Sequence, residues 1–329
     1  VSLFLIWLYT HRSGIKTIVW TDTIQTLCMV SALVLLTVQV YKQLDMSTGE
    51  LTKNLIAAGH SQIFVFDDWH SKQNFFKQFF SGIFIAIVMT GLDQDMMQKN
   101  LSCKNLKDAQ KNMYWYGFSF VPVNFLFLTL GGMLLLLASK YSIALPAKPD
   151  DILPLFATQY LGPIVTFLFV IGIIAATFAS SDSALTALTT SFAVDILGVQ
   201  HDDPKTSERK RRITHIGMSV LFVIIMVVFN IFNNTSVIDA IYKIASYTYG
   251  PLLGMFAFGL FTKYQVKDNM IPLVAVSSPI FCLLLNYISI SLFHYEFGYE
   301  ILMINGLLTF IGMWIFRQKS TEQKIQPLN

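Results

Sequence analysis

The chain has 329 residues, of which 54% are hydrophobic and only 13% are charged. A soluble domain carries about 25% charged residues, so this composition excludes an ordinary soluble domain and indicates a polytopic helical membrane protein in a lipid bilayer. The net charge of +3 gives no reason to expect a nucleic-acid partner, and the three widely spaced cysteines indicate neither a disulfide framework nor a metal motif.

The predicted membrane spans are apolar runs of about 20 residues or more, the length that crosses a bilayer. Residues 1–9 come first; they are too few to cross, and we interpret them as the end of a helix whose beginning is missing. The longer runs, in chain order, are 15–41, 79–98, 113–138, 163–197, 213–232, 238–262, 270–293 and 298–316. We therefore expect an all-α polytopic membrane protein with about eight full spans plus one partial span.

Basic residues determine the predicted orientation in the membrane. The strongest basic cluster, at 209–212, is placed in the cytoplasm by the positive-inside rule. Counting spans outward from it places the other strongly basic loops on the same side, as expected for a multi-pass protein of the plasma (inner) membrane. The outer loops at 42–78 and 139–162 are each expected to include a short interfacial helix, and residues 1–329 are expected to form a single transmembrane domain.

Two carboxylates lie inside predicted spans at similar depth, Asp22 in the first full span and Asp182 in the fourth. An ionisable group in the membrane costs about 2.5–3.5 kcal/mol on the insertion scale and is retained where it faces protein, water or an ion. Two such groups repel unless a cation or a proton lies between them, and Ser180 and Ser183 add the neutral oxygen ligands that hard cations prefer. The alternative, a Lys or Arg partner in the bundle, is disfavoured because no basic residue lies in mid-span.

Gly91 interrupts the second full span and is followed by a polar run that includes Asp93 and Gln94. Transporters build solute sites at such helix breaks, because the break exposes backbone groups near the midplane of the membrane. For Asp93 and Gln94 a solute site and a simple membrane boundary are both open interpretations. For the polar residues in 95–99 we favour the inner membrane boundary.

Pro251 follows Gly250 in the sixth full span and predicts a kink, because proline lacks an amide donor and clashes with the preceding turn. Three tyrosines, Tyr242, Tyr247 and Tyr249, precede this point. Such a set near a membrane boundary is typical of an interfacial aromatic belt. The alternative is a stacking surface or gate beside a solute.

Four sequence stretches, in the same order along the chain, resemble the sodium/solute symporter family, which includes the sodium/glucose, proline and sialic acid cotransporters. They are SGIK with WTDTIQ (13–25), GLDQ with QK (91–99), SSDSAL with DIL (180–197), and GPLLG with GLF (250–261). The resemblance implies a partial inverted-repeat fold of the leucine-transporter type. The run 15–41 would be the last helix of the first repeat and about 79–262 the second repeat. The resemblance also implies that most of the first repeat is missing, so that this fragment could not transport.

The resemblance implies that Na⁺ is the coupling ion and suggests its ligands. The main sodium site would use the carbonyl of Ala176 and two consecutive hydroxyl positions, here Ala179 and Ser180. Ala179 departs from the family pattern because it has no hydroxyl. Either Ser181 or Thr177 compensates, or the site is weaker.

A second sodium site, used by some family members, would take the carboxylate of Asp22 and the positions of Asp182 and Ser183. The family has neutral ligands at the latter two positions, so the carboxylate of Asp182 would raise cation affinity or bring in proton coupling.

The resemblance says less about the solute. The sugar-transporting members have Asn and Tyr on the helix before the break, where this chain has about Ala86 and Met89, so a sugar site of that kind is not expected. The expected substrate positions are Met89, Asp93, Gln94 and Tyr242.

The resemblance therefore favours a sodium-coupled symporter that moves a small organic solute across the membrane by alternating access. The alternatives are a transporter-like membrane sensor and a proton-coupled symporter. An enzyme is not expected: two intramembrane carboxylates can form the dyad of an intramembrane protease, but no Gly-x-Gly-Asp motif accompanies them, and no His-Glu-x-x-His motif is present.

Overall fold

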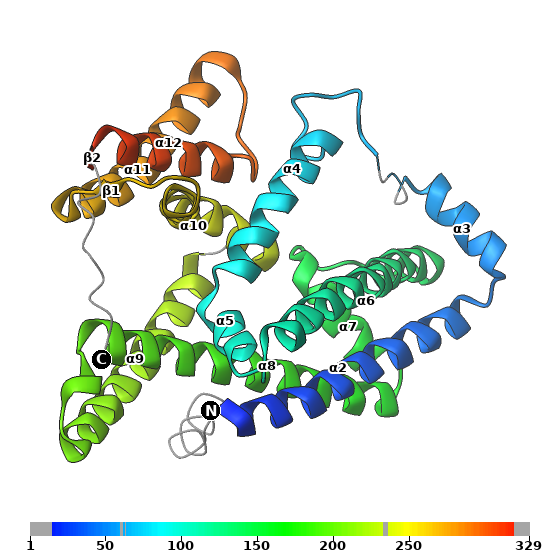
Figure 1. The fold of residues 1–329 in the computed structure, drawn as a ribbon. Coiled ribbons are helices and arrows are strands. Elements are labelled where there is room, and N and C mark those ends of the chain that lie inside the picture. Colours follow the sequence, from blue (N-terminus) through cyan, green and yellow to red (C-terminus); the bar gives the residue numbers. More distant parts are fainter. Residues whose placement is uncertain (1–14, 60–61, 63, 233–235, 319–329) are drawn as a thin grey trace. The chain divides into compact units, whose positions relative to one another are not determined.

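The protein is almost entirely helical in the computed structural model, which describes residues 15–318 apart from 60–61, 63 and 233–235 (Figure 1). The long helices are α2 (Ile15–Leu44), α6 (Leu106–Tyr141), α8 (Pro163–Ser191), α9 (Pro204–Phe232), α10 (Val237–Phe261) and α11 (Ile271–Phe293). The shorter helices are α3 (Thr48–Ala57), α4 (Phe75–Ala86), α5 (Gln94–Leu101), α7 (Ile152–Gln159) and α12 (Ile301–Ile315). The π-helical turns η1 (Ile87–Gly91) and η3 (Phe192–Ile196) extend α4 and α8, and β1 (Gln265–Val266) pairs antiparallel with β2 (Arg317–Gln318).

The predicted all-α membrane class is confirmed. Within the described residues, six helices are long and apolar enough to cross a membrane, and α4 with η1 and α5 makes a seventh if it is one broken span. The helix α12 is apolar but only 15 residues long. The exact number of spans therefore stays a prediction, and the partial span at residues 1–9 lies outside the described residues.

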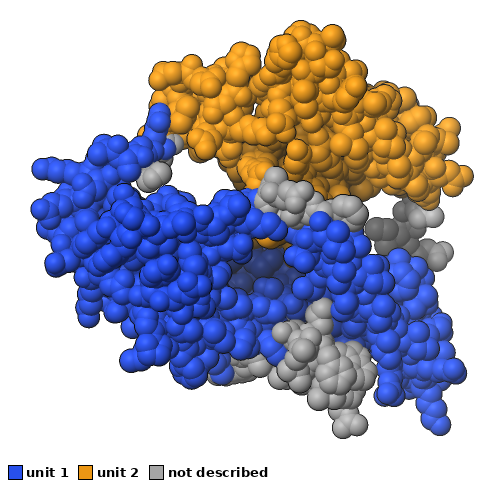
Figure 2. Space-filling view, turned by 180° about the vertical axis from the view of Figure 1, so that it is seen from behind, with its two compact units in different colours: residues 1–62, 94–236 blue, residues 63–93, 237–329 orange. Residues whose placement is uncertain are grey.

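The chain divides into two compact units (Figure 2). Unit 1 comprises residues 1–62 and 94–236, and unit 2 comprises residues 63–93 and 237–329. One of the three changes from one unit to the other falls at the break between η1 and α5. The single domain expected from the sequence stays a prediction, and each unit is described by itself below.

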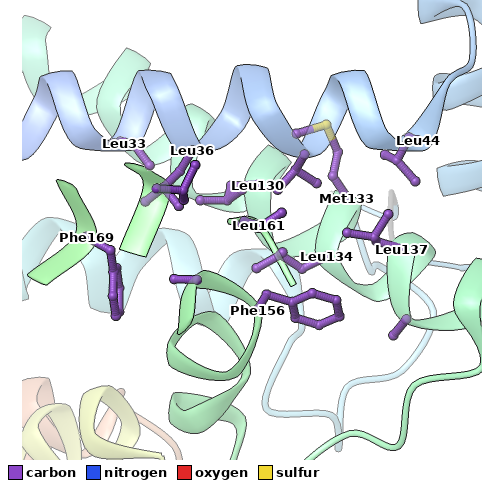
Figure 3. Packing of buried hydrophobic residues seen from close by; sticks show 14 of the residues in the cluster. Leu33, Leu36, Leu44, Leu130, Met133, Leu134, Leu137, Phe156, Leu161 and Phe169 are labelled. Atoms are coloured by element: carbon purple, nitrogen blue, oxygen red, sulfur yellow. The ribbon is translucent and has the colours of Figure 1, made fainter. Parts of the chain in front are cut away.

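The core of unit 1 lies among α2, α6, α7 and α8 (Figure 3). Leu36 of α2, Leu137 of α6 and Phe156 of α7 are buried in it. In a bilayer such contacts stabilise the bundle by close packing rather than by removing apolar surface from water. Gly172 of α8 lies close to α2, since a Cβ atom at this glycine would be 3.3 Å from the Cβ of Ala32. This packing holds the polar start of α2 beside α8.

Short helices occur in both predicted outer loops. In the first loop, α3 begins with a capping box, in which Ser47 and Glu50 each accept a hydrogen bond from the other's backbone amide. Leu55 of α3 packs on Gly132 of α6, where a Cβ atom would be only 2.8 Å from the Leu55 Cδ2 atom. In the second loop, α7 contributes Phe156 to the core of unit 1.

The core of unit 2 centres on α10 and α12, and a buried asparagine connects them. The helix α10 runs through Pro251 without interruption, although proline provides no amide for the carbonyl of Tyr247 four residues earlier. Asn305 of α12, which is fully buried, donates its Nδ2 to that carbonyl at 2.7 Å and to the carbonyl of Ser246 at 3.3 Å. Its Oδ1 accepts from Ser278 of α11 at 2.6 Å. A side chain thus replaces the backbone donor that Pro251 lacks.

Asn305→Leu is expected to lower the free energy of unfolding by about 1–3 kcal/mol, because it leaves buried polar groups without partners. In a Pro251→Ala background the new amide can pair with the Tyr247 carbonyl, so the same substitution should cost less. Thermal unfolding of the purified full-length protein in detergent measures both effects. An equal cost in the two backgrounds would show that the proline-freed carbonyl is not what Asn305 stabilises.

Candidate functional site

The helices α2 and α8 bring together two residues that the sequence predicted for the second ion site. Ser183 of α8 is buried, and its Oγ donates to Oδ2 of Asp22 on α2 at 3.4 Å. The Asp22 side chain retains 20% of its exposure. The side chain of Asp182, the third predicted member, lies outside the described residues, so the predicted pairing of two carboxylates stays a prediction.

Lys99 of α5 is the residue that sequence reasoning missed. Its Nζ lies 3.0 Å from Oδ2 of Asp22 and 3.0 Å from Oδ2 of Asp95, one helical turn earlier. The basic partner that the sequence disfavoured is therefore present for Asp22. The interpretation of the polar residues in 95–99 as only the inner membrane boundary did not include a contact between Lys99 and Asp22. The sequence signal was weak, because Lys99 lies at the end of its span and 77 positions from Asp22 along the chain.

Two further oxygens at this place are buried and unsatisfied. Oδ1 of Asp22 and Oε1 of Gln25 have no hydrogen-bond partner among the described residues. The two residues are three apart on α2 and so lie on the same face of the helix. An open cavity of about 680 Å³ adjoins Asp22 and Lys99. Its lining also includes Thr23, Thr26, Met96, Cys103, Asn112 and Tyr116. The lining of this cavity is mostly apolar, and Asp22 and Lys99 are its charged groups.

The predicted main sodium ligands lie on α8, before Ser183 in the chain. They are farther than Ser183 from the polar start of α2. Ala176 lines a small apolar cavity of about 190 Å³ with Met29 and Ala32 of α2 among its other lining residues. Ser180, one turn later, is exposed. Thr177 and Ser181 carry the two hydroxyls that were predicted to compensate for Ala179. The Thr177 hydroxyl donates to its own helix, to the Ile173 carbonyl at 2.8 Å. Ser181 is buried, and the side chain of Ala179 lies outside the described residues.

The predicted substrate residues lie in different surroundings. Met89, in the π-helical turn η1, packs against Val88, Leu253 and Leu302 in unit 2. Asp93 lies in the break and belongs to unit 2, whereas Gln94 begins α5 in unit 1 and is exposed.

Tyr242, the fourth predicted substrate residue, lies in a polar and aromatic cluster of unit 2. Its ring centroid is 5.4 Å from that of Tyr299, whose hydroxyl donates to Asp239 at 2.7 Å. These contacts suit the interfacial belt as well as a solute gate.

Charge pairs join the loop between α11 and α12 to the segment before α4 and to α10. Glu296 lies 2.7 Å from Lys72 and 3.2 Å from Lys243. Lys77 is buried, and its Nζ lies 4.3 Å from the ring centroid of Tyr295 and 5.7 Å from that of Trp69. Lys72, followed by Lys243, holds the pKa of Glu296 below its usual value, although partial burial acts in the opposite direction.

Acid is expected to weaken this connection. Because the folded-state pKa of Glu296 is lowered, its stabilising contribution is present above the unfolded value of 4.5 and is lost as the pH falls through the folded value. Melting temperatures of the wild type and of Glu296→Gln, measured between pH 3 and 7, test this expectation. The wild type should lose more stability toward acid than the variant, and parallel curves would contradict the assignment.

Comparisons with known proteins agree with this architecture. The family model of the sodium:solute symporter family matches residues 1–268. The chain is 22% identical over 285 residues to the sodium/sialic acid symporter SiaT of Proteus mirabilis, covering 84% of this chain and 57% of SiaT. It is 24% identical over 265 residues to the mouse sodium-coupled monocarboxylate transporter 2, covering 77% of this chain and 42% of that protein. The chain thus spans about half the length of the curated relatives it matches.

A solved structure shows the same fold. It is a substrate-bound, outward-open Na⁺-coupled sialic acid symporter, whose description reports a novel Na⁺ site. The structures superpose with a TM-score of 0.77 at 19% identity, covering 97% of this chain and 67% of the other. At this identity the likeness shows the fold, while the family model covers most of the chain. The chain belongs to the sodium:solute symporter family, a family of membrane transporters rather than enzymes.

Proposed function

We propose that the protein containing this chain is a sodium-coupled symporter that moves a small organic solute by alternating access. The observation that carries the proposal is the contact of Asp22 with Ser183 next to Lys99 of α5, the helix that follows the break at Gly91, in a chain of the sodium:solute symporter family. Helix breaks at such positions provide solute and ion sites in transporters. The protein would lie in the plasma (inner) membrane with its basic loops in the cytoplasm, as the positive-inside rule predicts.

The solute is proposed to be an organic anion. The relatives named above act on sialic acid and on monocarboxylates, and both kinds of molecule carry a carboxylate. Met89, Asp93, Gln94 and Tyr242 are the proposed solute-contacting positions. The mismatch at Ala86 and Met89 with the sugar-transporting members argues against a neutral sugar.

Two ion positions are proposed on α8. The main sodium site would use the carbonyl of Ala176 and the hydroxyl of Ser180, one helical turn apart. The second cation position would use Asp22, Asp182 and Ser183. Carboxylate, carbonyl and hydroxyl oxygens are the ligands that hard cations prefer.

Uptake into proteoliposomes that contain the full-length protein tests the function. Radiolabelled sialic acid, lactate and glucose are offered with an inward sodium gradient, with potassium in place of sodium, and with a protonophore. Accumulation of an acid that requires sodium and survives the protonophore is expected. Uptake that does not depend on sodium and is abolished by the protonophore would instead favour a proton-coupled symporter. This is the alternative that the carboxylate of Asp182 supports.

Ser180→Ala is expected to raise the sodium concentration for half-maximal uptake by about tenfold, because loss of a ligand worth about 1.4 kcal/mol has this effect. Ser191→Ala is the matched control on the same helix, since the Ser191 hydroxyl donates to Asp195 at 2.9 Å, away from the proposed ligands. An unchanged sodium dependence in Ser180→Ala would remove this residue from the site.

A further inference from the structure

The helix α9 carries a basic stripe on its exposed side, formed by Lys205, Arg209 and Arg212. All three residues are exposed, and their spacing of four and three positions places them on one face of the helix. Thr214, on the opposite face, is buried, and within unit 1 the helix packs on α8. The basic stripe therefore lies on the side of α9 that is turned away from its buried face.

The other charged residues at the start of α9 leave the basic stripe positive. Lys210 pairs with Asp202 at 2.7 Å, so its charge is neutralised within unit 1. Asp203 precedes the helix and accepts a backbone amide through its side chain at 3.1 Å, as an N-cap does. Glu208 is the one acidic residue between positions 204 and 216. Three basic side chains thus outnumber the single carboxylate beside them on the helix.

The same face of α9 continues as an apolar stripe. It consists of residues that follow the basic stripe at helical spacing and keep between 43% and 54% of their exposure, namely Ile216, Val220, Val223 and Val227. A phospholipid has its parts in the same order, with a charged headgroup at the membrane surface and acyl chains in the core. A free phosphate or a nucleic acid would use the basic stripe alone and leave the apolar stripe without a role.

We propose that this face of α9 binds an anionic phospholipid of the cytoplasmic leaflet. The headgroup would lie at the basic stripe and the acyl chains along the apolar stripe. The positive-inside rule places the start of α9 on the cytoplasmic side, and basic residues next to a membrane span attract anionic lipids, each charge strengthening binding about fivefold. The proposal depends on the orientation of α9 in the membrane and is independent of the transported solute and ion.

Photo-crosslinking of the full-length protein in phosphatidylcholine nanodiscs tests the proposal. The probes are phosphatidylglycerol, which is anionic, and phosphatidylcholine, which has no net charge, each with a diazirine in the same acyl chain. Mass spectrometry of peptides then measures the label on residues 213–232. The anionic probe should label this segment of the wild type more strongly than the neutral probe does. Equal labelling by the two probes would overturn the proposal.

Variants of the basic stripe test its role. The triple variant Lys205→Gln, Arg209→Gln, Arg212→Gln should lose about a hundredfold in affinity for the anionic lipid, so that the two probes label it equally. Arg209→Gln alone should lose about fivefold, and Arg209→Lys should bind like the wild type. Arg211→Gln is the matched control, because it removes the same charge from a different face of the same turn. Equal losses in Arg209→Gln and Arg211→Gln would overturn the assignment to this face.

Two further measurements complete the test. Melting curves of each variant check the fold, and the pair Arg209→Gln and Arg211→Gln decides the question if the triple variant does not fold. Inorganic phosphate is added as a competitor at a concentration that leaves the ionic strength unchanged. It should leave the labelling by phosphatidylglycerol in place, whereas loss of the label would show a phosphate site without a part for the acyl chains and would overturn the proposal.

Discussion

Gly254→Leu is expected to prevent the protein from folding stably. Even a Cβ atom at this position of α10 would lie 2.5 Å from Cβ of Thr309 and would also meet the backbone carbonyl of Gly306, both on α12. Thr309 is fully buried and donates to the carbonyl of Asn305, so its side chain cannot move aside to make room for a larger residue. Overpacking of a close core usually costs about 1–3 kcal/mol, and a clash with backbone belongs above that range.

Gly259→Leu is the matched control for this prediction. It lies on the same helix, and apart from the adjoining helix backbone and chain neighbours no atom of the described residues lies within 4 Å of a Cβ atom built there. Melting curves and the yield of monodisperse full-length protein in detergent compare the two variants. Gly259→Leu should resemble the wild type, while Gly254→Leu should aggregate or melt at a much lower temperature. Similar behaviour of the two variants would show that α10 and α12 do not pack as closely as described.

Asp22→Ala is the second change with a large expected effect. It removes one of the two carboxylates that bind Lys99 and leaves the ammonium with Asp95. A hydrogen bond to a charged group contributes about 1.5–3 kcal/mol, and Asp22 is sufficiently buried for this range to apply. We expect the free energy of unfolding to fall by this amount and the maximal uptake rate to fall with it, because α5 is no longer tied to α2.

A double-mutant cycle separates the ion pair from other effects of Asp22. Lys99→Met in the Asp22→Ala background should cost little further stability, since the pair is already broken. Asp95→Ala is the comparison, because a partly exposed pair one turn apart on a helix contributes only about 0.3–0.5 kcal/mol. Additive costs for Asp22→Ala and Lys99→Met would show that the two side chains do not interact in the folded protein.

Hydropathy predicted the helices well but not where they begin. The run predicted at 213–232 belongs to α9, which begins nine residues earlier at Pro204. Those added turns carry the basic cluster at 209–212 and are helical without being apolar. Hydropathy reports which residues prefer lipid, whereas helical hydrogen bonding continues into the polar region beyond the membrane. The interruption at Gly91 was predicted, and the structure has η1 end there and α5 begin at Gln94.

The sequence by itself determined the helical membrane class, the likeness to sodium symporters, and the importance of polar groups such as Asp22 and Ser183, because polar residues in an apolar span stand out locally. Only the tertiary structure decided their partners. Lys99 reaches Asp22, and Asn305 reaches the carbonyl that Pro251 leaves free. Both contacts join helices far apart in the chain. Such pairings depend on which helix faces pack together, a property that no local pattern of residues contains.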